Sequence, residues 1–187
     1  MNKPALLAIV GSLRKDSYNK QVAMAAKEMI KDRATIELLD WADVPFMNQD
    51  IEFPAPETVN RVRNAVKAAD GIWFFTPEYN HAVPGTLKNL IDWLSRKVSD
   101  TEGDVLTGKC ATVSGASGGI YGAISAVDQL AALLNYLDMN VMNDPRTSIP
   151  HVMGVIQPDG TLAPGPSATF LQEQAEAFVD FVDARRA

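Results

Sequence analysis

A short polar segment near the N-terminus carries residue types that bind phosphate. It follows an apolar run and reads Gly11-Ser12-Leu13-Arg14-Lys15-Asp16-Ser17-Tyr18-Asn19-Lys20. The glycine permits a sharp turn, and the start of a following helix presents unpaired N–H groups and a positive dipole end. Ser12, Ser17 and Asn19 can donate side-chain hydrogen bonds, and Arg14 adds a guanidinium group that suits phosphate. The segment therefore predicts a cradle for a terminal phosphate monoester.

Two commoner phosphate motifs are absent from this segment. It has no Gly-x-Gly-x-x-Gly for a dinucleotide pyrophosphate and no Gly-x-x-x-x-Gly-Lys-Ser/Thr for a nucleoside triphosphate. A purely structural interpretation stays open, in which Ser17 caps the helix while Arg14 and Lys15 lie in solvent. Asp16 would repel a phosphate, so we assign it to capping or to solvent.

A second segment has the composition of a wall for a planar ligand. It reads Thr76-Pro77-Glu78-Tyr79-Asn80-His81-Ala82-Val83-Pro84-Gly85. Pockets for cofactors combine apolar walls with a few placed polar groups in this way. Backbone N–H groups aimed at the pyrimidine edge of a flavin would stabilise negative charge on its reduced form. A rigid, proline-rich connector to the next helix is the alternative.

Alternating strands and helices must position these segments. Short apolar runs predict strands at 5–10, 35–39, 71–76, 110–114 and 139–142, and the fourth runs into a glycine-rich stretch, 115–119. Apolar residues at helical spacing predict helices that follow each strand, with 144–166 as a loop before the last one. This order predicts one domain, 1–187, of the α/β class with a doubly wound parallel sheet. Such sheets bind ligands beyond the carboxyl ends of their strands.

Composition excludes several classes of function. The chain has 187 residues, 47% hydrophobic and 21% charged, and its formal net charge of −6 disfavours nucleic acid and anionic membranes. One cysteine, Cys110, and two histidines, His81 and His151, leave little material for disulfides, metal sites or a histidine-based triad. No apolar stretch approaches the roughly 18 residues of a membrane span. We therefore expect a cytoplasmic protein whose difficult chemistry belongs to a bound cofactor.

Two motifs in matching order carry a family resemblance. Gly-Ser-Leu-Arg-x-x-Ser-Tyr-Asn, with Pro-Glu-Tyr-Asn-x-x-x-Pro-Gly-x-Leu-Lys-Asn-x-Ile-Asp-Trp, resembles the NADPH-dependent FMN reductase family, closest to its quinone and chromate reductase branch. The resemblance runs from about Ala5 to Met142. It implies a flavodoxin-like fold, with a five-stranded parallel sheet in the order 2-1-3-4-5 and helices on both faces.

The resemblance also assigns site residues. It implies that the FMN phosphate is held by Ser12, Arg14, Ser17 and Asn19, with Tyr18 and Lys20 as neighbours. It implies that the isoalloxazine lies along Pro77, Glu78, Tyr79 and Asn80. The third loop beside the flavin corresponds to Ser114, Gly115, Ser117, Gly118 and Gly119. Lys88, Asn89 and Asp92 belong to the same signature, and we expect them to anchor the loop or helix rather than react.

The implied activity is that of an FMN-dependent oxidoreductase. NADPH or NADH would give a hydride to FMN, and a quinone, azo, nitroaromatic or chromate acceptor would then take the electrons in a ping-pong scheme. A flavodoxin-type electron carrier without a site for a hydride donor is the first alternative. A phosphate-binding or interaction module without flavin is the second.

Three further expectations concern residues outside these loops. The helical stretch 130–137 is apolar on nearly every side, which favours a subunit interface, joined by Trp93 and Leu94, in a homodimer or homotetramer. His81 either borders the substrate or lies on the surface. Cys110 should be a buried, inert thiol.

Overall fold

The apolar runs of the sequence form the strands of a parallel sheet. The computed structural model describes residues 2–186. Its strands are β1 (Ala5–Val10), β2 (Thr35–Leu38), β3 (Gly71–Thr76), β4 (Cys110–Ala116), β5 (Asn140–Val141) and β6 (Thr147–Ile149). They pair in parallel in the order β2-β1-β3-β4-β5, and β6 also pairs with β4. The order 2-1-3-4-5 and the flavodoxin-like α/β fold are thus confirmed.

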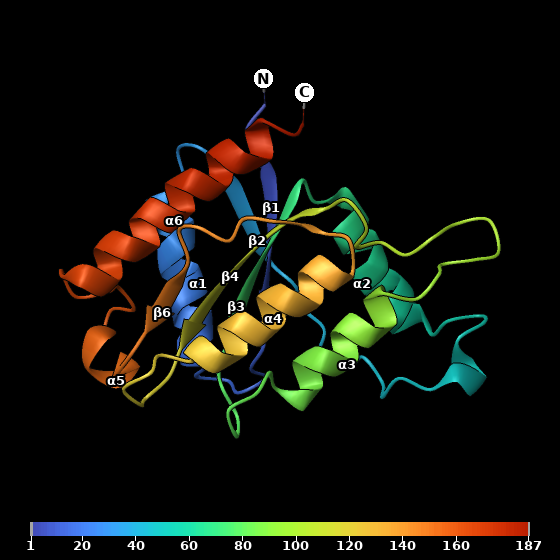
Figure 1. Cartoon of the computed structure of the whole chain (residues 1–187), viewed down its shortest axis with the longest axis horizontal. Coiled ribbons are helices and arrows are strands. Elements are labelled where there is room, and N and C mark those ends of the chain that lie inside the picture. The colour runs from blue at the N-terminus through green and yellow to red at the C-terminus, as the bar shows by residue number, and fades with distance from the viewer. Residues whose placement is uncertain (1, 187) are drawn as a thin grey trace.

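Helices cover both faces of this sheet (Figure 1). They are α1 (Tyr18–Met29), α2 (Glu57–Ala68), α3 (Gly85–Leu94), α4 (Ile124–Tyr136), α5 (Val152–Val155) and α6 (Pro166–Asp183), with a single 3-10 turn at Gln49–Ile51. α1 and α6 pack on one face, and α2, α3 and α4 pack on the other. The two ends of the chain lie side by side at the edge away from the predicted site (Figure 1).

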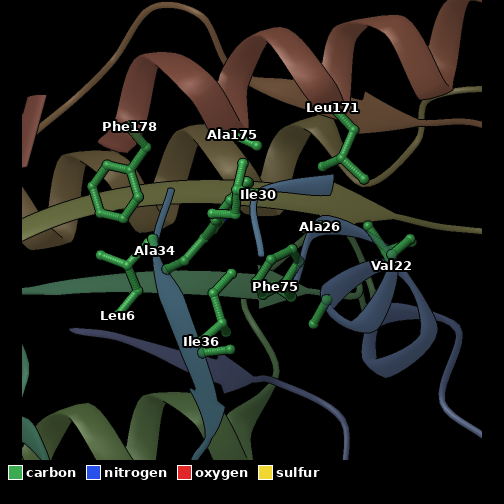
Figure 2. Close-up of a cluster of buried hydrophobic side chains, with 14 of the residues drawn as sticks. Leu6, Val22, Ala26, Ile30, Ala34, Ile36, Phe75, Leu171, Ala175 and Phe178 are labelled. Atoms are coloured by element: carbon green, nitrogen blue, oxygen red, sulfur yellow. The ribbon is translucent and has the colours of Figure 1, made fainter. Parts of the chain in front are cut away.

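Alternate residues of the central strands supply two separate cores. In β1, Leu6 and Ala8 face the α1 and α6 layer, while Leu7 and Ile9 face the opposite layer. Figure 2 shows the first core, where β1 and β3 meet side chains of α1 and α6, among them Val22, Ala26, Leu171 and Phe178. Burying a large apolar side chain fully contributes roughly 1.5–3 kcal/mol. Both faces of the sheet are therefore held firmly beneath the loops at its carboxyl edge.

The segment after β5 differs from the predicted loop at 144–166. It contains β6 and α5, and β6 pairs with Ser114, Gly115 and Ala116 at the end of β4. β5 pairs only with Cys110 and Ala111 at the start of β4. The fifth position of the sheet is consequently occupied by two short strands. Ile149 and Val152 are fully buried, and this apolar burial gives the segment its order.

No helix within residues 2–186 has the length and apolar character needed to cross a membrane.

Candidate functional site

The loop after β1 is packed closely against the loop after β3. The Gly11 N–H donates to the Phe75 carbonyl at 2.8 Å. A Cβ at Gly11 would lie 2.9 Å from Leu87 Cδ2 and 3.3 Å from Pro77 Cδ, so the close approach requires glycine. This contact places the predicted phosphate loop and the predicted flavin wall next to each other.

Ser17 and Asn19 fix the start of α1. The Ser17 hydroxyl accepts a hydrogen bond from the Lys20 N–H at 3.3 Å and forms the N-cap that the sequence suggested. The Asn19 amide donates to the Ala116 carbonyl at 3.0 Å, which ties α1 to the end of β4. The other atom of that amide, Oδ1, is buried without a hydrogen-bond partner among the described residues. Asn19 therefore keeps one free polar atom at the site.

Arg14 and Tyr18 lie on the outer side of the same loop. The guanidinium carbon of Arg14 stands 5.2 Å from the centre of the Tyr18 ring. The Ser12 hydroxyl accepts a hydrogen bond from the Arg14 backbone N–H at 3.4 Å. Arg14 makes no ion pair within residues 2–186, so its charge is available to an anion.

The loop after β3 is a tight two-residue turn held by α4. Tyr79 and Ala82 exchange two backbone hydrogen bonds of 3.1 Å, and both residues between them have positive φ, 54° at Asn80 and 59° at His81. Asparagine and histidine tolerate this left-handed conformation better than most residues. The Glu78 carboxylate accepts from the Ala126 N–H at 3.2 Å, in the first turn of α4. The turn is thereby fixed to the neighbouring helix.

One cavity brings most of the predicted residues together. Its volume is about 180 Å³, and it lies where β1, β3 and β4 end. It is lined by Ser12, Arg14, Ser17, Tyr18, Asn19, Pro77, Glu78, Tyr79, Ala116, Ser117 and Gly118. We call this the cofactor cavity. Ala116 is the one lining residue that sequence reasoning missed, because its contribution includes a backbone carbonyl that no side-chain pattern reveals.

The remaining predicted residues lie outside the cavity. Ser114 is fully buried, accepts from Trp73 Nε1 at 2.9 Å and donates to Gln174 at 2.7 Å, so it joins β4 to β3 and α6. A Cβ on Gly115 would lie 2.6 Å from Val127, which shows that this glycine packs against α4. Asn80 forms the tight turn described above.

The third loop is held by the segment that the sequence did not predict. The Gly119 carbonyl accepts from the His151 N–H at 3.1 Å. The Ser117 N–H donates to the Ile149 carbonyl at 3.1 Å, and the Ser117 carbonyl accepts from the Val152 N–H at 3.0 Å. β6 and α5 therefore position the wall of the cavity that contains Ser117 and Gly118.

Other residues noted in the sequence have structural surroundings. The His81 side chain is 78% exposed and lies 3.3 Å from the Glu78 carboxylate, at the surface. Asn89 accepts from the Met47 N–H and donates to the Pro45 carbonyl, and Lys88 pairs with Asp92, as expected of anchoring residues. Burial raises the pKa of the Cys110 thiol, in agreement with an inert cysteine.

The cavity fits the phosphate end of FMN. Its polar groups are the hydroxyls of Ser12 and Ser17, the Arg14 guanidinium and the unpartnered oxygen of Asn19, which can accept a hydrogen bond from a polyol hydroxyl. The half-exposed Tyr79 borders the cavity, so the ring of an FMN held there would lie next to the protein surface.

Comparison with known proteins identifies the family of the chain. Residues 4–154 match the model of the NADPH-dependent FMN reductase family. The chain is 35% identical to an NAD(P)H-dependent FMN reductase of Pseudomonas aeruginosa over 173 residues, covering 92% of this chain and 91% of the relative. It is also 35% identical to a quinone reductase of Pseudomonas putida over 184 residues, with 98% and 97% covered.

A solved structure shares the whole fold. FerB, a flavoenzyme NAD(P)H:(acceptor) oxidoreductase from Paracoccus denitrificans, superposes with a TM-score of 0.89 at 33% identity, covering 97% of this chain and 98% of FerB. On the family match and these relatives together, the chain belongs to the NADPH-dependent FMN reductase family.

Proposed function

We propose that this FMN reductase works by a ping-pong mechanism, in which NAD(P)H and then a quinone or similar acceptor occupy one site in turn. The observation that carries the proposal is the cofactor cavity at the carboxyl ends of β1, β3 and β4, which is bordered by the half-exposed Tyr79. Bound FMN supplies the redox chemistry, accepting a hydride from NAD(P)H and returning electrons to the acceptor. The protein then needs no nucleophile or acid–base pair of its own.

The chain's residues bind and orient in this scheme. Arg14, with Ser12, Ser17 and the N–H groups of the first turn of α1, would hold the phosphate. Asn19 would accept a hydrogen bond from the polyol chain through its free oxygen. Pro77 and Tyr79 would flank the ring, with Glu78 fixing their loop to α4. Ser117 and Gly118 would form the opposite wall.

Rapid anaerobic reduction distinguishes the enzyme from an electron carrier. The purified protein is loaded with FMN and mixed with NADPH or NADH without oxygen, while the flavin absorbance is followed. Fast bleaching, followed by recovery of the colour on adding benzoquinone, is expected. A yellow protein that the donors do not bleach would favour the flavodoxin-type carrier. A protein that takes up no FMN would favour the module without flavin.

The acceptor is proposed as a class rather than as one compound. Quinones, azo dyes, nitroaromatics and chromate can all take electrons from an exposed flavin. Steady-state kinetics with NADPH and each acceptor should give parallel double-reciprocal lines, which is the pattern of a ping-pong scheme. Intersecting lines would show that donor and acceptor bind together and would contradict the shared site.

We also propose that the protein is a homodimer or homotetramer and acts in the cytoplasm. The outer face of α4 exposes Ile124 and Tyr136, and Ile120 and Tyr121 stand exposed just before it. Trp93 and Leu94 do not join this face, since both are fully buried within the chain. Sedimentation velocity at micromolar concentration should give a dimer or larger species, and a monomer would contradict this part of the proposal.

A further inference from the structure

A second cavity adjoins the cofactor cavity at the carboxyl ends of β1 and β2. Its volume is about 350 Å³, and its walls come from the loop after β1 and the segment after β2. We call it the basic groove, and its lining includes Arg14, Lys15, Lys20, Asp40 and Trp41. The two cavities share Ser12 and Arg14. A ligand that reaches from one cavity into the other would pass this shared wall.

The three cations of the groove form no ion pair within residues 2–186, although Asp40 lies in the same lining. These cations, Arg14, Lys15 and Lys20, are exposed. Some other cations of the chain are paired, for instance Arg33 with Asp180 and Arg96 with Glu52. The chain as a whole carries a formal net charge of −6. The groove is thus a local positive site on an acidic protein, which favours an anion there.

The far wall of the groove offers a hydrogen-bond acceptor and an apolar surface. Asp40 follows β2, and its carbonyl accepts from Arg61 at 2.6 Å, which fixes the backbone at this point. Trp41 is 5% exposed and lines the groove beside Leu38. In parallel sheets that bind dinucleotides, phosphates lie at the loop after the first strand, and a nearby cation accommodates the 2′-phosphate of NADP. The cations and the apolar wall of the groove suit a phosphorylated nucleoside whose 2′-phosphate lies on the side of the lysines, away from the Asp40 carboxylate.

We propose that the basic groove binds the phosphorylated adenosine end of the hydride donor, with Lys15 and Lys20 contacting the 2′-phosphate that distinguishes NADPH from NADH. The inference rests on the proposed function, because the nicotinamide must reach the cofactor cavity. A phosphate monoester carries about −1.5 to −2 charges at neutral pH, so a donor phosphate beside the FMN phosphate is repelled unless further cations lie between them. Lys15 and Lys20 supply those charges.

The reductive half-reaction tests the groove against a matched control. Lys15→Gln, Lys20→Gln and the double variant are loaded with FMN and mixed anaerobically with increasing NADPH or NADH. Lys27→Gln is the control, because Lys27 is an exposed cation on α1 that borders neither cavity. The double variant should bind NADPH at least about tenfold more weakly, with a much smaller change for NADH and an unchanged limiting rate. Equal behaviour of the double variant and the control would overturn the inference.

Direct binding gives a readout that needs no turnover. The oxidised, FMN-loaded protein is titrated by calorimetry with 2′,5′-ADP, 5′-AMP and inorganic phosphate. We expect 2′,5′-ADP to bind most tightly, to weaken as salt is raised and to weaken further in the double variant. If inorganic phosphate binds as tightly as 2′,5′-ADP, the groove is a simple anion site and the inference is wrong.

Failure of the inference can be told apart from failure of the proposed function. If the lysines serve only the FMN phosphate, the double variant loses FMN affinity while its donor affinities stay unchanged, which overturns the inference alone. If NADPH bleaches the wild-type protein and the lysine variants behave like the wild type, the inference is also overturned while the proposed function stands. A wild-type protein that neither binds FMN nor bleaches would instead remove the proposed function.

Discussion

Side chains around the cofactor cavity differ in whether they form hydrogen bonds within the protein. The Asn19 amide bonds the end of β4, and the Glu78 carboxylate bonds the first turn of α4, so both side chains hold loops in place. Within residues 2–186 the Arg14 guanidinium lies over the Tyr18 ring and makes no ion pair or side-chain hydrogen bond. Substitutions of these residues should therefore have different effects on stability and on ligand affinity.

Arg14→Ala should weaken FMN binding without destabilising the fold. Loss of a charge-assisted contact to the phosphate predicts a dissociation constant raised by about tenfold or more. Because Arg14 is exposed and pairs with no acid within residues 2–186, the urea midpoint should stay close to that of the wild type. Fluorescence titration of the apoprotein with FMN measures the affinity, with Lys27→Ala as the control. An unchanged FMN affinity would remove Arg14 from the phosphate cradle.

Glu78→Ala and Glu78→Gln should differ in stability. Alanine leaves the Ala126 N–H without its acceptor, at a cost of about 1–3 kcal/mol. Glutamine keeps an acceptor oxygen and loses only the charge near the start of α4, which is worth about 0.3–1 kcal/mol. Urea unfolding of the two variants measures the difference. Equal losses in both would show that the charge, rather than the hydrogen bond, holds the loop.

Sequence reasoning located the cavity residues that act through local geometry. Ser17 and Arg14 are recognisable because a glycine turn before a helix is visible within ten residues. Ser114 is different, since its partner Gln174 lies 60 residues further on. β4 is buried along its whole length, so alternation of polar and apolar residues could not tell whether Ser114 faces a ligand or the core.

At the scale of elements, the connection from β4 to α4 depends on close packing against β6. Gly122 has φ +60°, and a Cβ there would lie 2.8 Å from backbone atoms of Ile149 and Pro150. Backbone atoms on a buried strand cannot move aside as a flexible side chain can. The wall of the cavity formed by Ser117 and Gly118 is therefore coupled to the position of β6.

Gly122→Ala should destabilise the protein more than Gly160→Ala. Both glycines have positive φ, which costs alanine about 1–2 kcal/mol, but a Cβ at Gly160 would meet no atom within 4 Å. The clash at Gly122 adds about 1–3 kcal/mol. Thermal unfolding of the two variants measures the difference. Similar melting temperatures would show that the packing of β6 against this turn is looser than described.

β6 and α5 were not predictable because little in their sequence is periodic. Three residues, Thr147–Ile149, are too few to show alternation, and prolines on both sides favour a loop assignment. Their order comes from long-range contacts, such as the Thr147 hydroxyl donating to the Phe170 carbonyl at 3.1 Å. The five longer helices were predictable because each carries an apolar stripe of several turns.

At the scale of the whole molecule, the sheet separates two cores, and the redox chemistry lies at one edge. The sole cysteine lies at the other end of β4 from the cofactor cavity and is buried. Strands buried on both faces identify a parallel sheet but not the order of its strands, which the family resemblance implied.

Cys110 should react with a thiol reagent only when the protein unfolds. Burial raises the pKa of its thiol, which reduces the reactive thiolate at any given pH, and only 5% of the residue is exposed. The rate of reaction with Ellman's reagent at pH 8 should follow the unfolding rate and rise in urea. Rapid modification of the native, FMN-loaded protein would contradict this burial.

The two short strands at the fifth position of the sheet also affect how readily the protein aggregates at high concentration. The edge strands of the sheet are short. β2 has four residues at one edge, and β5 and β6 have two and three residues at the other. Such edges present few consecutive unpaired peptide groups to a neighbouring molecule. Strand-by-strand addition into fibrils is thereby disfavoured, although the central strands β3 and β4 are highly apolar.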